Sequence, residues 1–211
     1  MTNNYNHIAF IYDALVRLVF GHQLVKAQRC FLSELPQNAN ILFVGGGTGK
    51  ILPELLSIAQ PHIVDYVELS PKMISIAKKR CLHQERVQFI QKDFNDFVPN
   101  KKYDVVITFF FLDLFEEEKI NRLIQKINMS LSTDGLWLFA DFVDRGHYQW
   151  YQKVFVKLMY AFFRLFTNVE RHKLPHFLNH FAKHSLHTIK VKHFFHGLIS
   201  SKILVKEKRG A

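Results

Sequence analysis

The sequence predicts a single doubly wound α/β domain, in which helices cover both faces of a mainly parallel β-sheet. Short apolar runs of strand length alternate with segments of helical periodicity along most of the chain. The first of these runs ends in a cluster of glycines, as the first strand of such a sheet often does. The chain closes with two segments of alternating polarity, which indicate an antiparallel hairpin at the end of the sheet.

Five short apolar runs are predicted to form parallel strands. The first is wholly apolar and ends in glycines, which is typical of a strand that is buried on both faces. The fourth is rich in β-branched and aromatic residues, and a predicted turn at residues 133–135 precedes the fifth. The runs cover residues 41–44, 63–69, 87–91, 103–110 and 136–142.

Helical segments are predicted between these strands and before them. Residues 51–58 and 116–131 have helical spacing, and Pro71 suits the first turn of another helix. Residues 8–35 are expected to be helical and to lie over the carboxyl edge of the sheet or beside it. Right-handed crossovers between parallel strands place such helices on both faces of the sheet.

The end of the chain departs from this alternation. Residues 187–195 and 198–206 each alternate in polarity, and His196-Gly197 can form a turn between them. They predict the antiparallel hairpin that closes the sheet. Between the fifth strand and this hairpin, His172, His176, His180 and His184 recur every fourth residue on an expected helix. No carboxylate or cysteine completes a ligand set nearby, so no metal site is expected.

The composition is that of a globular protein. The 211 residues are 48% apolar and 22% charged, which excludes disordered and fibrous classes. Residues 1–6 lack the charged and then apolar run of a signal peptide. The two cysteines, Cys30 and Cys81, suggest no disulfide framework. A cytoplasmic location is therefore expected.

The net charge of +10 is concentrated in the last third of the chain. Residues 1–144 contain 15 Lys/Arg and 16 Asp/Glu, whereas residues 145–211 contain 13 and 2. Such an asymmetry indicates an anionic partner, which could be lipid head groups, an acidic substrate or nucleic acid. A solvated basic surface explains the same counts.

The glycine turn after the first strand stands where open α/β sheets bind ligands. Gly45, Gly46, Gly47 and Gly49 allow a sharp turn and a close approach of the backbone to a ligand. Thr48 is expected to cap the following helix and to leave N–H groups free for an anion. We interpret the adjacent Gly46 as permitted in the turn.

The spacing of the glycines distinguishes the ligand-binding motifs that use such a turn. A phosphate-binding P-loop requires glycine where Val44 stands and Ser or Thr where Ile51 stands. The dinucleotide fingerprint requires glycine at Lys50 if it starts from Gly45. The turn instead follows a Gly-x-Gly-x-Gly pattern.

Acidic residues follow the second and third strands. Glu68 closes the second strand about 20 residues after the turn, where a carboxylate can accept hydrogen bonds from both hydroxyls of a ribose. Asp93 follows the third strand, and the neighbouring Phe94 offers an apolar face for an adenine ring. Each alone could be an ordinary polar residue at the end of a strand, but their order along the chain indicates a nucleoside site.

With these features the sequence resembles the class I S-adenosylmethionine-dependent methyltransferases over roughly residues 5–206, and within them the small enzymes related to the menaquinone and ubiquinone methyltransferases. The matching stretches are ILFVGGGTGK, VELSPKMI, VQFIQKDFNDF, YDVVITFFFLDLF and LSTDGLWLFADF, together with the early IAFIYD. The resemblance implies a seven-stranded sheet with a reversed last strand, S-adenosyl-L-methionine as cofactor and S-adenosyl-L-homocysteine as product. The residues expected to bind the cofactor are Gly45, Gly46, Gly47, Thr48, Gly49, Glu68, Leu69, Met73, Asp93, Phe94 and Phe109.

The resemblance also divides the single domain into three functional parts. Residues 1–35 are expected to form an N-terminal helical cap, residues 36–145 the cofactor-binding core, and residues 146–211 the acceptor-site helices and the closing hairpin. Residues 148–166 are apolar around most of a helix and are expected to be a wall of the acceptor site, or a buried helix. Such a basic, aromatic surface could also rest on an anionic membrane.

The acceptor is expected to be a small hydrophobic or aromatic molecule that is methylated at oxygen or carbon. Neighbouring residues of a strand point to opposite faces, so some of the phenylalanines that end the fourth strand belong to the core. If the acceptor must lose a proton, Asp141 and His147 are the candidate proton acceptors, whereas Asp113 is expected to cap the next helix together with Glu116. The expected acceptor pocket consists of Tyr5, Tyr12, Phe110, Phe111, Tyr148 and Tyr151.

Two other functions remain open from the sequence. An RNA methyltransferase would use the basic last third of the chain to bind phosphates, although no Asn/Asp-Pro-Pro-Tyr/Phe-like motif stands at residues 108–111. A cofactor-binding interaction module without catalysis would have the same fold.

Overall fold

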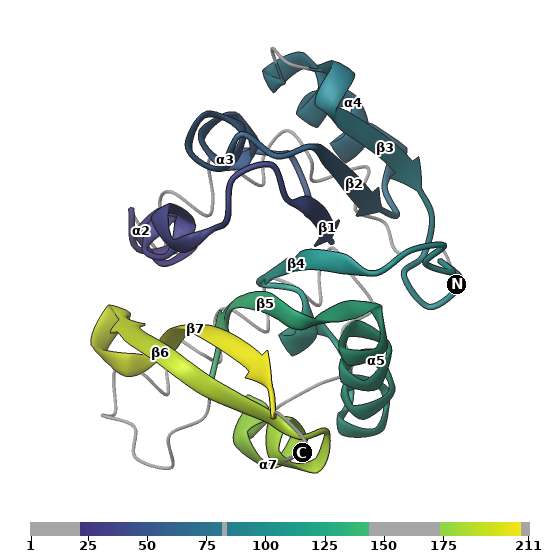
Figure 1. The fold of residues 1–211 in the computed structure, drawn as a ribbon. Helices are drawn as coiled ribbons and strands as arrows, with labels where there is room; N and C mark the ends of the chain where they lie inside the picture. The colour runs from purple at the N-terminus through teal and green to yellow at the C-terminus, as the bar shows by residue number, and fades with distance from the viewer. Residues whose placement is uncertain (1–21, 82–83, 144–173, 208–211) are drawn as a thin grey trace.

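The computed structural model describes residues 22–81, 84–143 and 174–207. Within them, seven strands form one sheet in the order β3-β2-β1-β4-β5-β7-β6 (Figure 1). The first five strands are parallel, and β7 is antiparallel to both of its neighbours. This confirms the predicted sheet and its reversed last strand. The strands are β1 (Asn40–Val44), β2 (Ile63–Glu68), β3 (Val87–Gln91), β4 (Tyr103–Phe109), β5 (Leu131–Phe142), β6 (Leu186–Phe194) and β7 (Ile199–Lys206).

Helices cover both faces of the sheet (Figure 1). One face carries α2 (Gln23–Arg29), α3 (Leu52–Ala59) and α4 (Pro71–Arg80), and the other carries α5 (Glu117–Ser130) and α7 (Phe177–Lys183). This arrangement confirms the doubly wound architecture. Short 3-10 helices complete the described part: η1 (Leu32–Glu34), η2 (Gln84–Arg86), η3 (Leu112–Leu114) and η4 (Phe195–Gly197).

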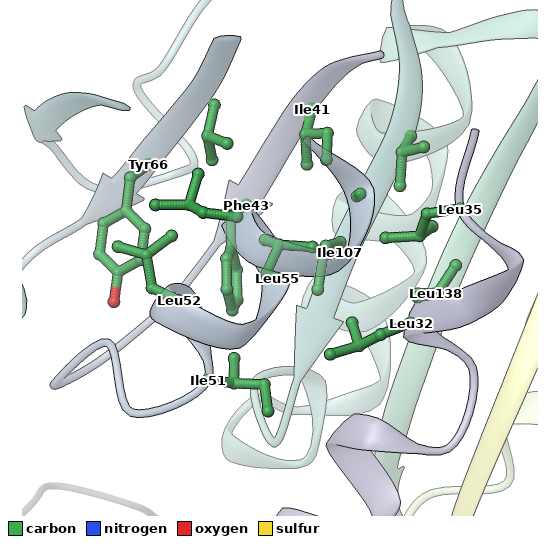
Figure 2. Packing of buried hydrophobic residues seen from close by; sticks show 14 of the residues in the cluster. Leu32, Leu35, Ile41, Phe43, Ile51, Leu52, Leu55, Tyr66, Ile107 and Leu138 are labelled. Atoms are coloured by element: carbon green, nitrogen blue, oxygen red, sulfur yellow. The ribbon is translucent and has the colours of Figure 1, made fainter. Parts of the chain in front are cut away.

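The apolar runs of the sequence are explained by burial on both faces. In β1, Ile41 and Phe43 pack with α3, whereas Leu42 and Val44 pack on the α5 side. Figure 2 shows Phe43 in the first of these layers, beside Tyr66 of β2. A strand whose two faces are both covered has no reason to alternate in polarity.

The second layer is built from aromatic side chains of β5 and α7. Phe139 of β5 packs edge-on against Phe177 and Phe181, with ring centroids 4.9 and 5.2 Å apart. These two phenylalanines are four residues apart and therefore share one face of α7. Trp137 is also buried here, and its Nε1–H donates to Thr108 Oγ1 at 2.8 Å. Aromatic burial thus fixes α7 on the sheet.

The N-terminal helical segment lies beside the sheet where it is described. Ala27 of α2 packs with Phe142 and Ile199, and the Ser201 hydroxyl donates to its carbonyl oxygen at 2.8 Å. Hence α2 flanks the last strands, which is one of the two placements expected from the sequence.

β3 has the predicted bounds, whereas five strands differ from the prediction by one residue at one or both ends and β5 begins five residues earlier than predicted. β5 begins at Leu131, immediately after α5, and its pairing with β4 shifts between Tyr103 and Val105, so residues 132–135 are an irregularity within the strand. β4 ends at Phe109 because Phe110 takes a left-handed conformation with φ of 53°.

The histidine periodicity does not describe one helix face. α7 contains only His180 of the series, whereas His176 and His184 flank it and His172 lies outside the described residues. His180 contacts Glu117, and His184 Nε2 lies 3.0 Å from Asn121 Oδ1. These two histidines therefore join α7 to α5. The described ranges hold no cluster of three side chains suited to a metal ion.

A helix must be both long and apolar to cross a membrane. No helix in the described part of the chain is long and apolar enough. The predicted apolar segment at residues 148–166 lies outside that part.

Candidate functional site

The glycine turn follows β1 at the carboxyl edge of the parallel strands. Gly45, Gly47 and Gly49 all have left-handed φ angles, of 63°, 61° and 68°. The Gly45 N–H donates to the carbonyl oxygen of Val67 at 2.8 Å, which ties the start of the turn to β2. The turn therefore stands at the switch point where open α/β sheets bind ligands.

Tyr66 fills the space beneath the turn. A Cβ atom added to Gly46 would stand 2.2 Å from Tyr66 Cζ, which is far closer than any van der Waals contact. The Tyr66 hydroxyl donates to the carbonyl oxygen of Gly47 at 3.0 Å. Gly46 is therefore required by close packing, a constraint that the glycine pattern of the sequence did not indicate.

Glu68 closes β2 beside the turn, as predicted. Its carboxylate is 8% exposed. Oε2 accepts a hydrogen bond from the Gly47 N–H at 3.0 Å, and Oε1 accepts one from the Ser70 N–H at 2.9 Å. Burial raises the pKa of Glu68, and the backbone donors oppose that rise. Each carboxylate oxygen can accept a further hydrogen bond, so the group can still bind a pair of hydroxyls.

Thr48 does not cap the helix that follows. α3 begins at Leu52, and its N-cap residue Ile51 makes no side-chain cap. Instead, Arg80 Nη1 of α4 donates to the Thr48 carbonyl oxygen and hydroxyl at 3.1 and 2.8 Å. The turn continues past Thr48, because helical geometry starts only at Leu52. The role of Thr48 is to fasten the turn to α4.

α4 has the cap that its sequence allows. The Met73 N–H donates to Ser70 Oγ at 3.2 Å, and Pro71 occupies the first turn. This start places Met73 beside the glycine turn, where its Sδ lies 3.8 Å from a Cβ position built on Gly47. Leu69 is 40% exposed next to Glu68. The buried carboxylate is thus flanked by two apolar side chains.

The connection after β3 is held by α5. Asp93 Oδ1 accepts hydrogen bonds from the backbone and side-chain nitrogens of Asn95 at 2.9 and 2.6 Å. Within the described residues, Asp93 Oδ2 makes no hydrogen bond. Lys126 Nζ donates to the carbonyl oxygens of Phe94 and Asn95 at 2.7 and 2.6 Å. Asp93 therefore keeps one carboxylate oxygen for a ligand.

Phe94 points away from the expected adenine face. Its side chain is 3% exposed and packs with Phe97 and Phe111, with ring centroids 6.2 Å away in each case. The turn at Asp93 directs the ring beneath α5, where burial of its apolar area is favourable. The expectation of an open aromatic face at Phe94 is therefore wrong, although its backbone stays beside Asp93.

The phenylalanines that end β4 alternate between the two sides of the sheet, as expected. Phe109 joins the α3 side, 5.8 Å from the Phe43 ring. Phe111 packs on the α5 side, where its Cδ2 lies 2.4 Å from a Cβ position built on Gly45. Phe110 is half-buried, and its ring lies 5.3 Å from Phe142. Phe110 and Phe111 thus bring aromatic surface to the edge where the glycine turn stands.

Asp141 and Asp113 form a buried acidic pair behind this edge. Asp141 is fully buried, and its Oδ2 accepts hydrogen bonds from the N–H groups of Leu112 and Asp113 at 2.9 and 3.3 Å. Burial, and then the neighbouring Asp113 carboxyl to which it hydrogen-bonds, raise the pKa of Asp141 well above its ordinary value. The predicted cap by Asp113 is wrong, because Glu116 is the N-cap residue of α5 and makes no side-chain cap.

Sequence reasoning missed Tyr66, Arg80 and Lys126, which position the turn and the loop after β3. Their hydrogen bonds join residues that are far apart in the chain, so no local sequence pattern predicts them. The remaining predicted site residues lie outside the described ranges: Tyr5, Tyr12, His147, Tyr148 and Tyr151.

Comparisons with known proteins point to methyltransferases. A family model described as a methyltransferase domain matches residues 41–135. The chain is 30% identical over 153 residues to a malonyl-[acyl-carrier protein] O-methyltransferase from Halalkalibacterium halodurans, which covers 66% of this chain and 53% of the relative. The chain spans about half the length of the curated relatives that it matches first.

Solved structures show the same fold at lower identity. The DhpI complex with S-adenosylhomocysteine superposes with a TM-score of 0.72 at 17% identity, over 97% of this chain and 94% of that one. The mitomycin 7-O-methyltransferase MmcR gives a TM-score of 0.69 at 15% identity, over 98% of this chain and 61% of that one. At such identities the likeness concerns the fold.

The fold and the site together define an open α/β domain of the kind that binds a nucleoside cofactor at the carboxyl edge of its sheet. More specifically, the match to a methyltransferase domain, the similar O-methyltransferases and the shared fold support a class I S-adenosylmethionine-dependent methyltransferase, in agreement with the resemblance found in the sequence.

Proposed function

We propose that this chain transfers a methyl group from S-adenosylmethionine to an oxygen or carbon atom of a small, hydrophobic or aromatic acceptor. The observation that carries the proposal is the buried Glu68 carboxylate, hydrogen-bonded to Gly47 in the turn after β1. The names of the O-methyltransferases to which the chain is similar support the reaction type. The aromatic edge formed by Phe110 and Phe111 supports an apolar acceptor.

The residues at the turn fit the cofactor. In the proposed complex, Glu68 accepts hydrogen bonds from the ribose hydroxyls, Asp93 Oδ2 accepts one from the adenine side, and Leu69 and Met73 provide apolar contact. When bound, S-adenosylmethionine supplies a methyl group on a positively charged sulfur. The other residues proposed to contact it are Gly45, Gly46, Gly47, Thr48, Gly49, Phe94 and Phe109.

On the acceptor side, the chain's task is alignment and exclusion of water, because methyl transfer is an in-line displacement. Phe110 and Phe111 would form part of an apolar floor. Asp141 is buried and held by backbone N–H groups, and its raised pKa favours the protonated form. We therefore assign Asp141 to positioning the segment after β4, and we keep His147 as the proposed proton acceptor for an acidic acceptor group.

We also propose that the basic end of the chain contacts an anionic surface such as a membrane. The outer strand β6 carries Lys190 and Lys192, together with His187 and His193, all of them exposed. The two exposed lysines lie on one face of this edge strand, where Lys190 also pairs with Glu34, and they support such a contact.

The cofactor claim is tested by calorimetry with S-adenosylhomocysteine. Glu68→Ala should weaken binding by about tenfold or more, which corresponds to about 1.4 kcal/mol. Glu34→Ala, on η1 and beside Ala39 at the opposite end of β1, is the matched control and should bind as the parent does. Circular dichroism checks that both variants are folded. An unchanged affinity in Glu68→Ala would refute the site, and cofactor binding without turnover of phenols, enols or carboxylic acids would refute catalysis.

A further inference from the structure

A second hollow lies away from the glycine turn, between α7 and strands β6 and β7. It has a volume of about 580 Å³. Val143, Phe177, Leu178 and Val191 form its apolar lining. Leu178 and Val191 are both exposed to solvent by more than half, although they are large and apolar. We call this hollow the α7 groove.

Two polar residues of β7 lie at the bottom of the α7 groove. Ser200 pairs with Asp141 of β5, and Lys202 pairs with Phe139, whose ring packs on α7. Residues directly opposite each other in a sheet point to the same face, as do residues two apart in one strand. Both Ser200 and Lys202 therefore face α7.

Lys202 is a buried cation without an anion. The residue is 7% exposed, and none of the described carboxylates lies within 4.0 Å of its ammonium group. The Lys202 Nζ atom lies over the Phe181 ring, 5.6 Å from its centroid. A contact with an aromatic face offsets only part of the cost of removing an ammonium group from water. Burial accordingly lowers the pKa of Lys202.

Ser200 leaves a second polar group unpaired in the same place. The residue is 1% exposed, and its hydroxyl has no hydrogen-bond partner in the described structure. Buried polar groups in folded proteins are nearly always hydrogen-bonded, so each exception requires an explanation. Ser200 and Lys202 lie on the same face of β7. Their hydroxyl and ammonium groups are hydrogen-bond donors of the kind that bind a carboxylate.

We propose that the α7 groove binds an organic carboxylate with an apolar chain. The carboxylate accepts hydrogen bonds from Lys202 and Ser200, and the chain lies along Val143, Phe177, Leu178 and Val191. Charge complementarity selects an acid, and the apolar lining selects one with a hydrocarbon part. None of the groove residues named here belongs to the glycine turn or to the residues proposed to contact the cofactor, so binding at the two places can be measured separately.

Octanoate is a suitable probe, with octanol as the uncharged match. Calorimetric titration should show that the protein binds octanoate about tenfold or more tightly than octanol. Lys202→Met keeps the length of the side chain and removes the charge, and it should weaken octanoate binding about tenfold or more. Ser200→Ala should weaken it several-fold. Lys192→Met, on the neighbouring strand and opposite Ser201, is the control and should leave it unchanged.

The outcomes separate this proposal from others. Absence of octanoate binding, equal affinity for octanol, or octanoate binding that Lys202→Met does not change would each overturn it. Thermal unfolding of Lys202→Met checks its fold, and replacement of a buried charge by an apolar chain is often tolerated. Lys202→Met should bind S-adenosylhomocysteine as the parent does, so a failure here is distinguishable from failure of the proposed methyl transfer.

Discussion

At the scale of single residues, the tightest constraint on the proposed cofactor site is the contact between Tyr66 and Gly46. The tyrosine ring and hydroxyl occupy the volume that any side chain at position 46 would need. Gly46 does not have a left-handed φ, unlike Gly45 and Gly47, so the contact itself is what excludes a side chain. The Tyr66 hydroxyl then fixes the next carbonyl group of the turn. Core packing and the conformation of the glycine turn thus depend on one pair of residues.

This pair gives a stability prediction. Gly46→Ala should lower the free energy of unfolding by about 1–3 kcal/mol, as overpacking of a core does. In a Tyr66→Leu background the same change should cost at least about 1 kcal/mol less, because leucine lacks the ring atoms that clash. Urea unfolding of the four proteins measures both costs. Equal costs of Gly46→Ala in the two backgrounds would contradict the assigned contact.

At the scale of elements, α5 controls a loop to which it is not adjacent in sequence. Lys126 lies in the middle of the helix and reaches the two carbonyl groups that follow Asp93. It also lies over the Phe94 ring, 5.1 Å from the centroid. The loop after β3 is therefore held by a helix that follows the next strand, β4, along the chain.

Removal of the Lys126 hydrogen bonds should weaken cofactor binding more than it lowers the stability of the fold. Lys126→Ala should weaken S-adenosylhomocysteine binding about three- to tenfold, because the loop that presents Asp93 loses two charge-assisted hydrogen bonds. Its thermal midpoint should stay close to that of the parent, since the side chain is partly exposed. Arg122→Ala, one turn away and paired only weakly with Glu118, is the control. A large loss of stability together with unchanged affinity would show that the link is structural only.

At the scale of the whole molecule, the buried acids predict how stability depends on pH. The pKa values of Asp141 and Glu68 are raised in the folded state, mainly by burial. Between the unfolded value, about 4, and the raised folded value, the folded protein binds more protons than the unfolded chain. Stability from these groups is therefore complete below the unfolded pKa and is lost as the pH rises.

The Asp113→Asn substitution tests this pH dependence of the free energy of unfolding. The change removes the charge beside Asp141, so the pKa of Asp141 should fall toward its ordinary value. From about pH 5 to pH 8, the variant should lose less stability than the parent, by up to about 1.4 kcal/mol per pH unit for one proton. Urea unfolding at several pH values measures the slopes. Identical slopes would mean that the two carboxyl groups are not coupled.

The sequence alone determined the architecture of this protein and the place of its site. The apolar runs, the glycines after the first strand and the acid after the second all act locally, through burial periodicity and backbone freedom, and they are visible in a single chain. They predicted the parallel strands, the reversed end of the sheet, and Glu68 beside the turn. The sequence predicted the strand boundaries less accurately, because the start of a strand such as β5 depends on where a neighbouring strand can hydrogen-bond to it.

Only the tertiary structure decided which side chains serve the turn and which serve the core. Thr48 and Asp113 follow the pattern of helix caps, yet Arg80 and Asp141 bind them instead. Phe94 stands where an open ring was expected, yet α5 covers it. In each case the partner comes from a segment more than 25 residues away in the chain. Long-range packing outweighs local preference, because a buried contact contributes more free energy than a helix cap or an exposed ring.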